Sequence, residues 1–234
     1  MRQCDAFVRE IGATIMKTLI IIVSFVFGLM PACAAHRAQA VGQTGFLQHY
    51  EHLKPGEVDG AVMVYRKPDA DMRGYKNIVI DPVKVVLRAD SDARSLDLEE
   101  LTELAKTFHE ELVKEIAPIY PMASVAGPES MRLRVAITDV VPGSPVRGVL
   151  SVLPVGAAIA GATKMATGEY ADVGKVEVEM ELVDAASGER LGAAVDRRVG
   201  TKAPFRGSYD DAMDAFSLWA RRIASGLTMA RAQT

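Results

Sequence analysis

The sequence predicts an α+β domain built as a two-layer sandwich, with about four to five strands and two main helices on one face of the sheet. The predicted elements follow the order strand, helix, strand, hairpin, helix. Several of the strand segments alternate apolar and charged residues, so each has one polar face. The helices are therefore expected to cover the other face only.

The first strands are expected at Ala61–Tyr65 and at Asn77–Leu87, which is rich in Val and Ile. Pro82 cannot donate to a sheet ladder, so it predicts an edge or a bulge in the second of these strands. The helix that follows and the strand after it predict a parallel crossover.

The clearest helix is expected from Asp97 to Ile116. Asp97, with Glu100 three residues later, is typical of a capping pair at a helix start. Apolar residues recur at three- and four-residue steps and predict one buried face: Leu98, Leu101, Ala105, Phe108, Leu112 and Ile116.

Two further segments, Met131–Val141 and Val176–Asp184, alternate apolar residues with Arg in the first and Glu in the second. The second segment is expected to turn at Gly188 and return as a hairpin. Pairing Leu182 with Leu191 keeps the apolar residues on one face. The polar residues then form a predicted surface charge ladder: Arg132, Arg134, Glu177, Glu179, Glu181 and Arg198.

The last element is a helix expected from about Tyr209 to Leu227. Ser208 and Asp211 form a second capping pair. Its predicted apolar stripe consists of Ala212, Phe216, Trp219, Ile223 and Leu227.

The beginning of the chain resembles an export signal. Residues 16–33 place Lys17 before an apolar stretch that ends at Cys33, and residues 1–15 are poor leader material, so translation is expected to start at Met16. Lipidation of Cys33 is the leading interpretation. Cleavage after Ala34 or Ala40, giving a soluble periplasmic or secreted protein, and an uncleaved membrane anchor remain alternatives.

Beyond the leader, residues 34–60 are polar and turn-prone and are expected to form a tether with a docking segment that contains Phe46, Leu47, Tyr50 and Leu53. A single domain is expected from 61 to 229. It includes an apolar Gly/Ala-rich insertion at 146–168, in which Gly148–Thr163 carries no charge.

Composition excludes several classes of function. The two cysteines are Cys4 and Cys33, so a chain processed at Cys33 has no disulfide and no cysteine-based metal site. The chain carries 27 Lys and Arg against 30 Asp and Glu without a basic block, which disfavours nucleic acid as a partner.

No catalytic or cofactor motif is complete. The loop Gly156–Lys164 lacks the lysine that a phosphate-binding loop needs after its second glycine, and His109 lacks a second histidine at position 113. His36, His49 and His52 have no carboxylate pattern beside them. Aspartates beside strands are more typical of turns than of acid–base catalysis: Asp81, Asp139, Asp184 and Asp196. We therefore expect no metal, no cofactor and no enzyme activity.

The chain resembles a family of bacterial lipoproteins classified as a domain of unknown function. The resemblance spans about Gly45 to Leu227 and rests on a set of short motifs: Gly45-Phe46-Leu47 with Tyr50 and Leu53, Tyr75-Lys76, Asp81-Pro82-Val83, Phe108-His109, Arg132 to Asp139, Gly188-Glu189, Ala193 to Arg198, Phe216 and Trp219. It implies an exported, lipid-anchored envelope protein and brings no catalytic residues. Met30-Pro31 departs from the usual lipid-attachment motif.

These features predict a non-enzymatic accessory protein at the periplasmic face of the outer membrane, held by Cys33 and binding an unidentified envelope protein. One alternative is a self-assembling or membrane-contacting subunit that uses Gly148–Thr163, which includes a homo-oligomer. Another is a hydrolase or small-ligand binder that uses the strand-end aspartates.

Overall fold

The computed structural model describes residues 42–57, 60–143, 174–200 and 207–233. The predicted leader with Cys33, the upstream residues 1–15, His36, and the insertion 146–168 with its Gly156–Lys164 loop lie outside these residues. No helix within the described part of the chain is long and apolar enough to cross a membrane.

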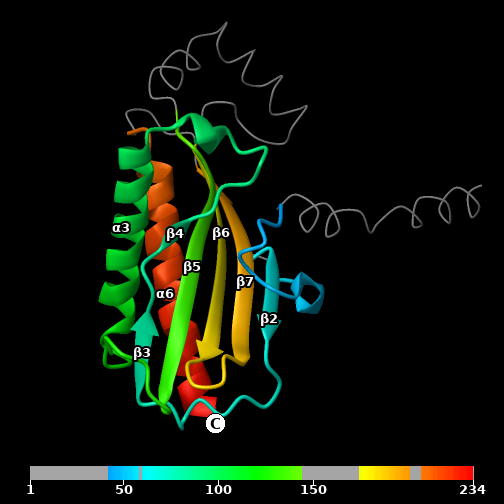
Figure 1. Cartoon of the computed structure of the whole chain (residues 1–234), viewed down its shortest axis with the longest axis vertical. Coiled ribbons are helices and arrows are strands. Elements are labelled where there is room, and N and C mark those ends of the chain that lie inside the picture. Colours follow the sequence, from blue (N-terminus) through cyan, green and yellow to red (C-terminus); the bar gives the residue numbers. More distant parts are fainter. Residues whose placement is uncertain (1–41, 58–59, 144–173, 201–206, 234) are drawn as a thin grey trace, which may run out of the picture. The chain divides into compact units, whose positions relative to one another are not determined.

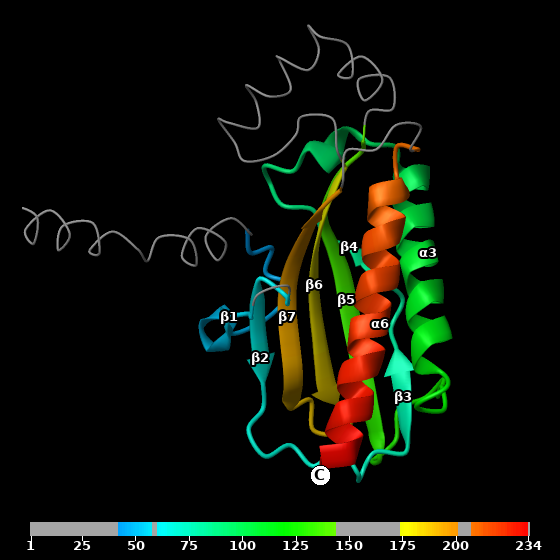
Figure 2. The same ribbon diagram turned by 180° about the vertical axis from the view of Figure 1, so that it is seen from behind.

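The described residues form one seven-stranded sheet with two long helices on one side of it (Figures 1 and 2). The strands are β1 (Lys54–Pro55), β2 (Met63–Arg66), β3 (Asn77–Ile80), β4 (Lys84–Val85), β5 (Ser130–Val141), β6 (Lys175–Asp184) and β7 (Arg190–Val199). Their order is β1-β2-β7-β6-β5-β3, and β4 also pairs with β5. The α+β class is confirmed, but four to five strands was an undercount.

The undercount has two causes. The segment predicted as one strand, Asn77–Leu87, is interrupted at Asp81-Pro82-Val83, and its two parts β3 and β4 each pair with β5 in parallel. The two-residue β1, paired with β2, is too short to leave a periodic signal. The predicted parallel crossover is confirmed by the β3–β5 pairing. Pro82 lies between β3 and β4, where the edge strand is interrupted.

The helices are α3 (Leu98–Ile116) and α6 (Asp210–Gln233), and short 3₁₀ turns lie at Tyr50–His52 and Asp92–Ser95. Asp97 caps α3 as predicted, since its side chain accepts a hydrogen bond from the Glu99 backbone N–H at 3.0 Å. Leu98 does not belong to the buried stripe, because it is 77% exposed while Leu101 and Leu104 are buried. The final helix extends beyond the predicted Leu227.

The predicted hairpin register is wrong by one residue. Leu182 pairs with Gly192 and Val183 with Arg190, so Leu191 is an extra residue in β7. This bulge shifts the rest of the strand: Met180 lies opposite Ala194 and Glu177 opposite Arg197, whereas the sequence pattern placed Ala193 opposite Met180 and Arg198 diagonal to Glu177. Gly188 has a φ of 75° in the turn, as the hairpin prediction required.

Candidate functional site

The two faces of the sheet are buried by different means. On the side that we call the helix face, apolar residues of β5 and β6 pack against α3 and α6. On the opposite side, the outer face, lie the alternate residues of the same strands. Residues 42–53, which we call the strap, cross this face, where Leu47 and Leu53 pack against Ala193 and Val195.

The glutamate row of β6 is buried and does not lie on the surface. Glu177, Glu179 and Glu181 are 1%, 0% and 4% exposed. The ladder was expected to be solvated because the sequence gives no sign of the residues that cover it. Each glutamate is stabilised by a different set of partners.

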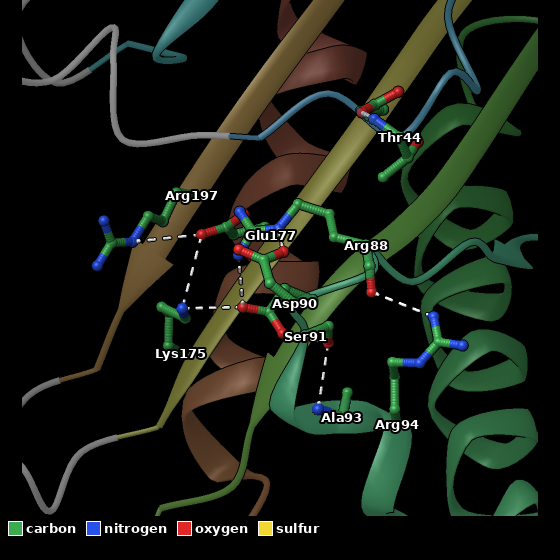
Figure 3. Close-up of polar contacts among 11 residues, drawn as sticks. Thr44, Arg88, Asp90, Ser91, Ala93, Arg94, Lys175, Glu177 and Arg197 are labelled. Atoms are coloured by element: carbon green, nitrogen blue, oxygen red, sulfur yellow. Dashed lines mark hydrogen bonds and ion pairs between the residues drawn. The ribbon is translucent and has the colours of Figure 1, made fainter.

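Glu177 lies in a cluster of five charged residues, which we call the ionic cluster: Arg88, Asp139, Lys175, Glu177 and Arg197 (Figure 3). The Arg88 guanidinium is 2.6 Å from Glu177 Oε2, and Lys175 Nζ is 2.8 Å from Asp139 Oδ2. Arg197, directly opposite Glu177 on β7, contributes its Nε at 3.6 Å. Three cations therefore face two buried carboxylates.

The two carboxylates of this cluster respond to burial differently. Burial raises the pKa of Glu177, and the charges of Arg88 and Lys175 offset only part of the effect. Burial acts in the same direction on Asp139, but hydrogen bonds from Lys175 and Ser91 outweigh it and lower the pKa. The Ser91 hydroxyl donates to Asp139 at 2.5 Å.

Glu179, in the middle of the row, is bound by the strap through uncharged donors. Its carboxylate accepts the backbone N–H of Thr44 at 2.9 Å and of Leu47 at 3.2 Å. The Tyr50 hydroxyl donates to it at 2.5 Å, and burial with the nearby Glu179 raises the pKa of Tyr50. Glu179 thus fixes the strap to the sheet.

Glu181 is bound by two arginines. Arg134, on β5, forms an ion pair with it, as the sequence pattern predicted for neighbouring strands. Arg190, on β7, forms a second ion pair with Glu181, in which the guanidinium nitrogen is 3.0 Å from the carboxylate. The other two predicted ladder members lie apart from the row, since Arg132 is 3.8 Å from Asp81 and Arg198 Nε is 3.3 Å from Asp196.

The strand-end aspartates do not converge on one another. Asp139 belongs to the ionic cluster, and Asp184 accepts N–H groups of the hairpin turn from Ala186 and Ser187. Asp196 is buried and accepts the Trp219 indole N–H of α6 at 2.6 Å. Their contacts are those of caps and structural bridges.

The three histidines that the structure describes form no hydrogen bond or ion pair with the strand-end aspartates, and the His109 Nδ1 is buried without a hydrogen-bond partner among the described residues. His109 lies on α3, and His49 and His52 lie in the strap, where their rings stack with centroids 5.6 Å apart. No group of three or more His, Cys, Asp or Glu side chains suited to a metal ion occurs within 42–57, 60–143, 174–200 and 207–233.

Sequence reasoning missed the partners that matter most on this face. Arg88 follows β4 in an irregular segment and gave no signal. Arg197 could have been identified as the partner of Glu177 only from the correct hairpin register. Tyr50 was recognised as an apolar anchor, but its hydroxyl contact with Glu179 has no sequence signature.

These features define a single-sheet α+β domain whose outer face holds buried ion pairs and is partly covered by residues 42–53. The chain belongs to the family described as "Protein of unknown function (DUF3313)", whose model matches residues 42–223. It is 29% identical over 160 residues to the uncharacterized lipoprotein YdcL of Escherichia coli K12, covering 68% of this chain and 71% of that protein.

Solved structures with a similar arrangement are distant. A PelC dodecamer from Paraburkholderia phytofirmans matches 70% of this chain and 95% of that chain with a TM-score of 0.39 at 12% identity. A Xanthomonas campestris protein of family DUF330 matches 72% of this chain and 92% of that chain with a TM-score of 0.42 at 7% identity.

Proposed function

We propose that this protein is exported, anchored through a lipid on Cys33 to the periplasmic face of the outer membrane, and acts there as a non-enzymatic accessory protein that binds another envelope component. The lipoprotein name of its relative supports the anchor. Ala34, next to the cysteine, is neutral, whereas an aspartate there would favour retention in the inner membrane.

The observation that carries the proposal is that the strap begins only a few residues after the predicted leader in the sequence. Strap residues pack on the sheet from Thr44 onward, through the bond from its N–H to Glu179. Cys33 and Gly42 are nine residues apart. Such a segment spans about 30 Å at most when fully extended. A lipid on Cys33 would therefore hold the domain close to the bilayer.

The contacts of the acidic residues support a binding role over catalysis. The buried carboxylates of Asp139, Glu177 and Glu181 are each engaged with cations of the same domain. A general acid or base has to reach its substrate, and these groups are covered.

Metabolic labelling with radioactive palmitate in the bacterium tests the anchor. We expect label in the wild type and in the matched control Cys4→Ala, because Cys4 precedes the expected start at Met16. Cys33→Ala should carry no label and should fractionate with soluble periplasmic proteins. Equal labelling of Cys33→Ala and wild type would contradict the proposal.

Crosslinking in intact cells, followed by purification, tests the binding role. An envelope protein enriched with the wild type and lost with the unanchored Cys33→Ala would support it. Identical neighbours for both proteins would show that the anchor does not determine the partner.

A further inference from the structure

A polar cleft lies at the Glu181 end of the outer face. Its volume is about 790 Å³, within the range of about 300–1,000 Å³ that is usual for small-ligand pockets. Its walls come from separate parts of the chain: the strap with His49 and His52, β4 with Lys84, β5 with Arg132, and the β6–β7 hairpin. Such convergence of distant segments is typical of a binding site.

The carboxylates around the cleft are mostly engaged. Glu181 is paired with Arg134 and Arg190. Asp184 accepts the N–H groups of the hairpin turn and the Tyr75 hydroxyl. Glu189 is 2.6 Å from Lys67. Asp81 also lines the cleft and is 3.8 Å from Arg132, so Lys84 is the lining cation to which the described residues offer no carboxylate.

Two cations of the cleft are poorly satisfied. The Arg132 side chain is 40% exposed, and its ion pair with Asp81 is loose, because the Nε lies 3.8 Å from the Asp81 carboxylate, beyond hydrogen-bond distance. Lys84 is exposed and forms no ion pair with any residue that the structure describes. A carboxylate or phosphate would satisfy both groups.

Aromatic rings line the strap side of the same cleft. The His49 and His52 rings stack at 5.6 Å with an interplanar angle of 21°, and the His52 and Tyr65 rings are 6.2 Å apart. All three residues line the same cleft as Arg132 and Lys84.

We propose that this cleft binds a small acidic ring compound, of the class of sugar acids and sugar phosphates. Arg132 and Lys84 hold its carboxylate or phosphate, and its ring lies against His49, His52 and Tyr65. The strap supplies one wall, so ligand binding requires the docked strap. The proposal does not depend on lipidation, because it concerns contacts within the domain only.

Calorimetric titration of the full chain in a neutral detergent tests this site, with galacturonate and glucose 6-phosphate as acidic probes and glucose as the neutral control. We expect saturable binding of at least one acid and none of glucose. Arg132→Gln and Lys84→Gln should each raise the dissociation constant at least tenfold. The matched control Lys114→Gln, on exposed α3, should leave it unchanged.

Circular dichroism establishes that each variant is folded, and Lys84→Gln removes an exposed side chain without disturbing packing. His52→Ala should weaken binding of the sugar acid severalfold and leave binding of inorganic phosphate unchanged. No saturable binding of either acid, or equal dissociation constants for wild type, Arg132→Gln and Lys84→Gln, would overturn the proposal.

Discussion

The helix face and the outer face belong to the same strands, but their side chains are buried by different interactions. The helix face is apolar, with Phe108 and Phe216 stacked at 4.4 Å between α3 and α6. The outer face buries the glutamates of β6 and stabilises them with arginines, a lysine and the strap. Apolar contacts have no direction, whereas a buried carboxylate needs each partner in place.

The strap is therefore part of the fold of this domain. Removing a helix would expose apolar surface, but removing the strap would leave Glu179 without its three donors. The two faces should therefore respond differently to mutation and to pH.

The largest expected effect is on the helix face. Phe216→Ala removes a fully buried ring from the stack with Phe108 and should lower the free energy of unfolding by about 4 kcal/mol. The loss should be the same between pH 4 and pH 8, since no charge changes. Urea denaturation measures it, and a strongly pH-dependent loss would contradict the apolar account. Met229→Ala, at an exposed position of α6, is the control.

The next effect is on the ionic cluster. Asp139→Asn removes the carboxylate nearest to Lys175 and a second partner of Arg88 from a buried cluster, and should cost about 3 kcal/mol at pH 7. The pKa of Asp139 is lowered in the folded state, so its stabilising effect is complete above about pH 4 and is lost as the pH falls through the folded value.

Denaturation of wild type and Asp139→Asn at several pH values checks this prediction. Their difference should shrink as the pH falls below about 4. Glu103→Gln, in an exposed α3 ion pair, should change stability by less than about 0.5 kcal/mol at every pH. A difference for Asp139→Asn that does not depend on pH would contradict the role of the charged carboxylate.

A smaller effect is expected in the strap. Tyr50→Phe removes a hydroxyl that donates to Glu179 and accepts the Gly45 and Leu47 N–H groups, and should cost about 1–2 kcal/mol. Proteolysis should then cut the N-terminal segment faster than in wild type while the helices remain protected. Unchanged cleavage there would show that the hydroxyl does not hold the strap.

The smallest effect concerns a residue that the sequence pattern assigned to the buried stripe. Leu98→Ala should change the free energy of unfolding by less than about 0.5 kcal/mol, because Leu98 is 77% exposed. Leu101→Ala, one turn later and buried, should cost about 2–3 kcal/mol. Thermal denaturation measures both variants, and an equal loss of stability in Leu98→Ala and Leu101→Ala would place Leu98 in the core.

The helix face could be predicted from sequence because its signals are local. Asp97 marks the start of α3, and the spacing of Phe108, Leu112 and Ile116 identifies its buried side. The apolar alternation of β5 and β6 likewise identified the residues that face the helices, among them Val135 and Val178.

The outer face could not be predicted because its partners are distant in sequence. Glu179 and Leu47 are 132 positions apart, and an alternating strand looks the same whether its polar face is solvated or covered. The one-residue bulge at Leu191 has no composition signal, yet it decides that Arg197, and not Asp196, lies directly opposite Glu177.

Hydrogen exchange at the Leu47 backbone amide tests the central claim most directly, because this N–H donates to the buried Glu179. In the intact protein it should exchange at least about 100-fold more slowly than in an unstructured peptide, and Tyr50→Phe should accelerate it. Exchange of the Leu47 amide at the free-peptide rate would contradict the account, since the strap would then not cover the outer face.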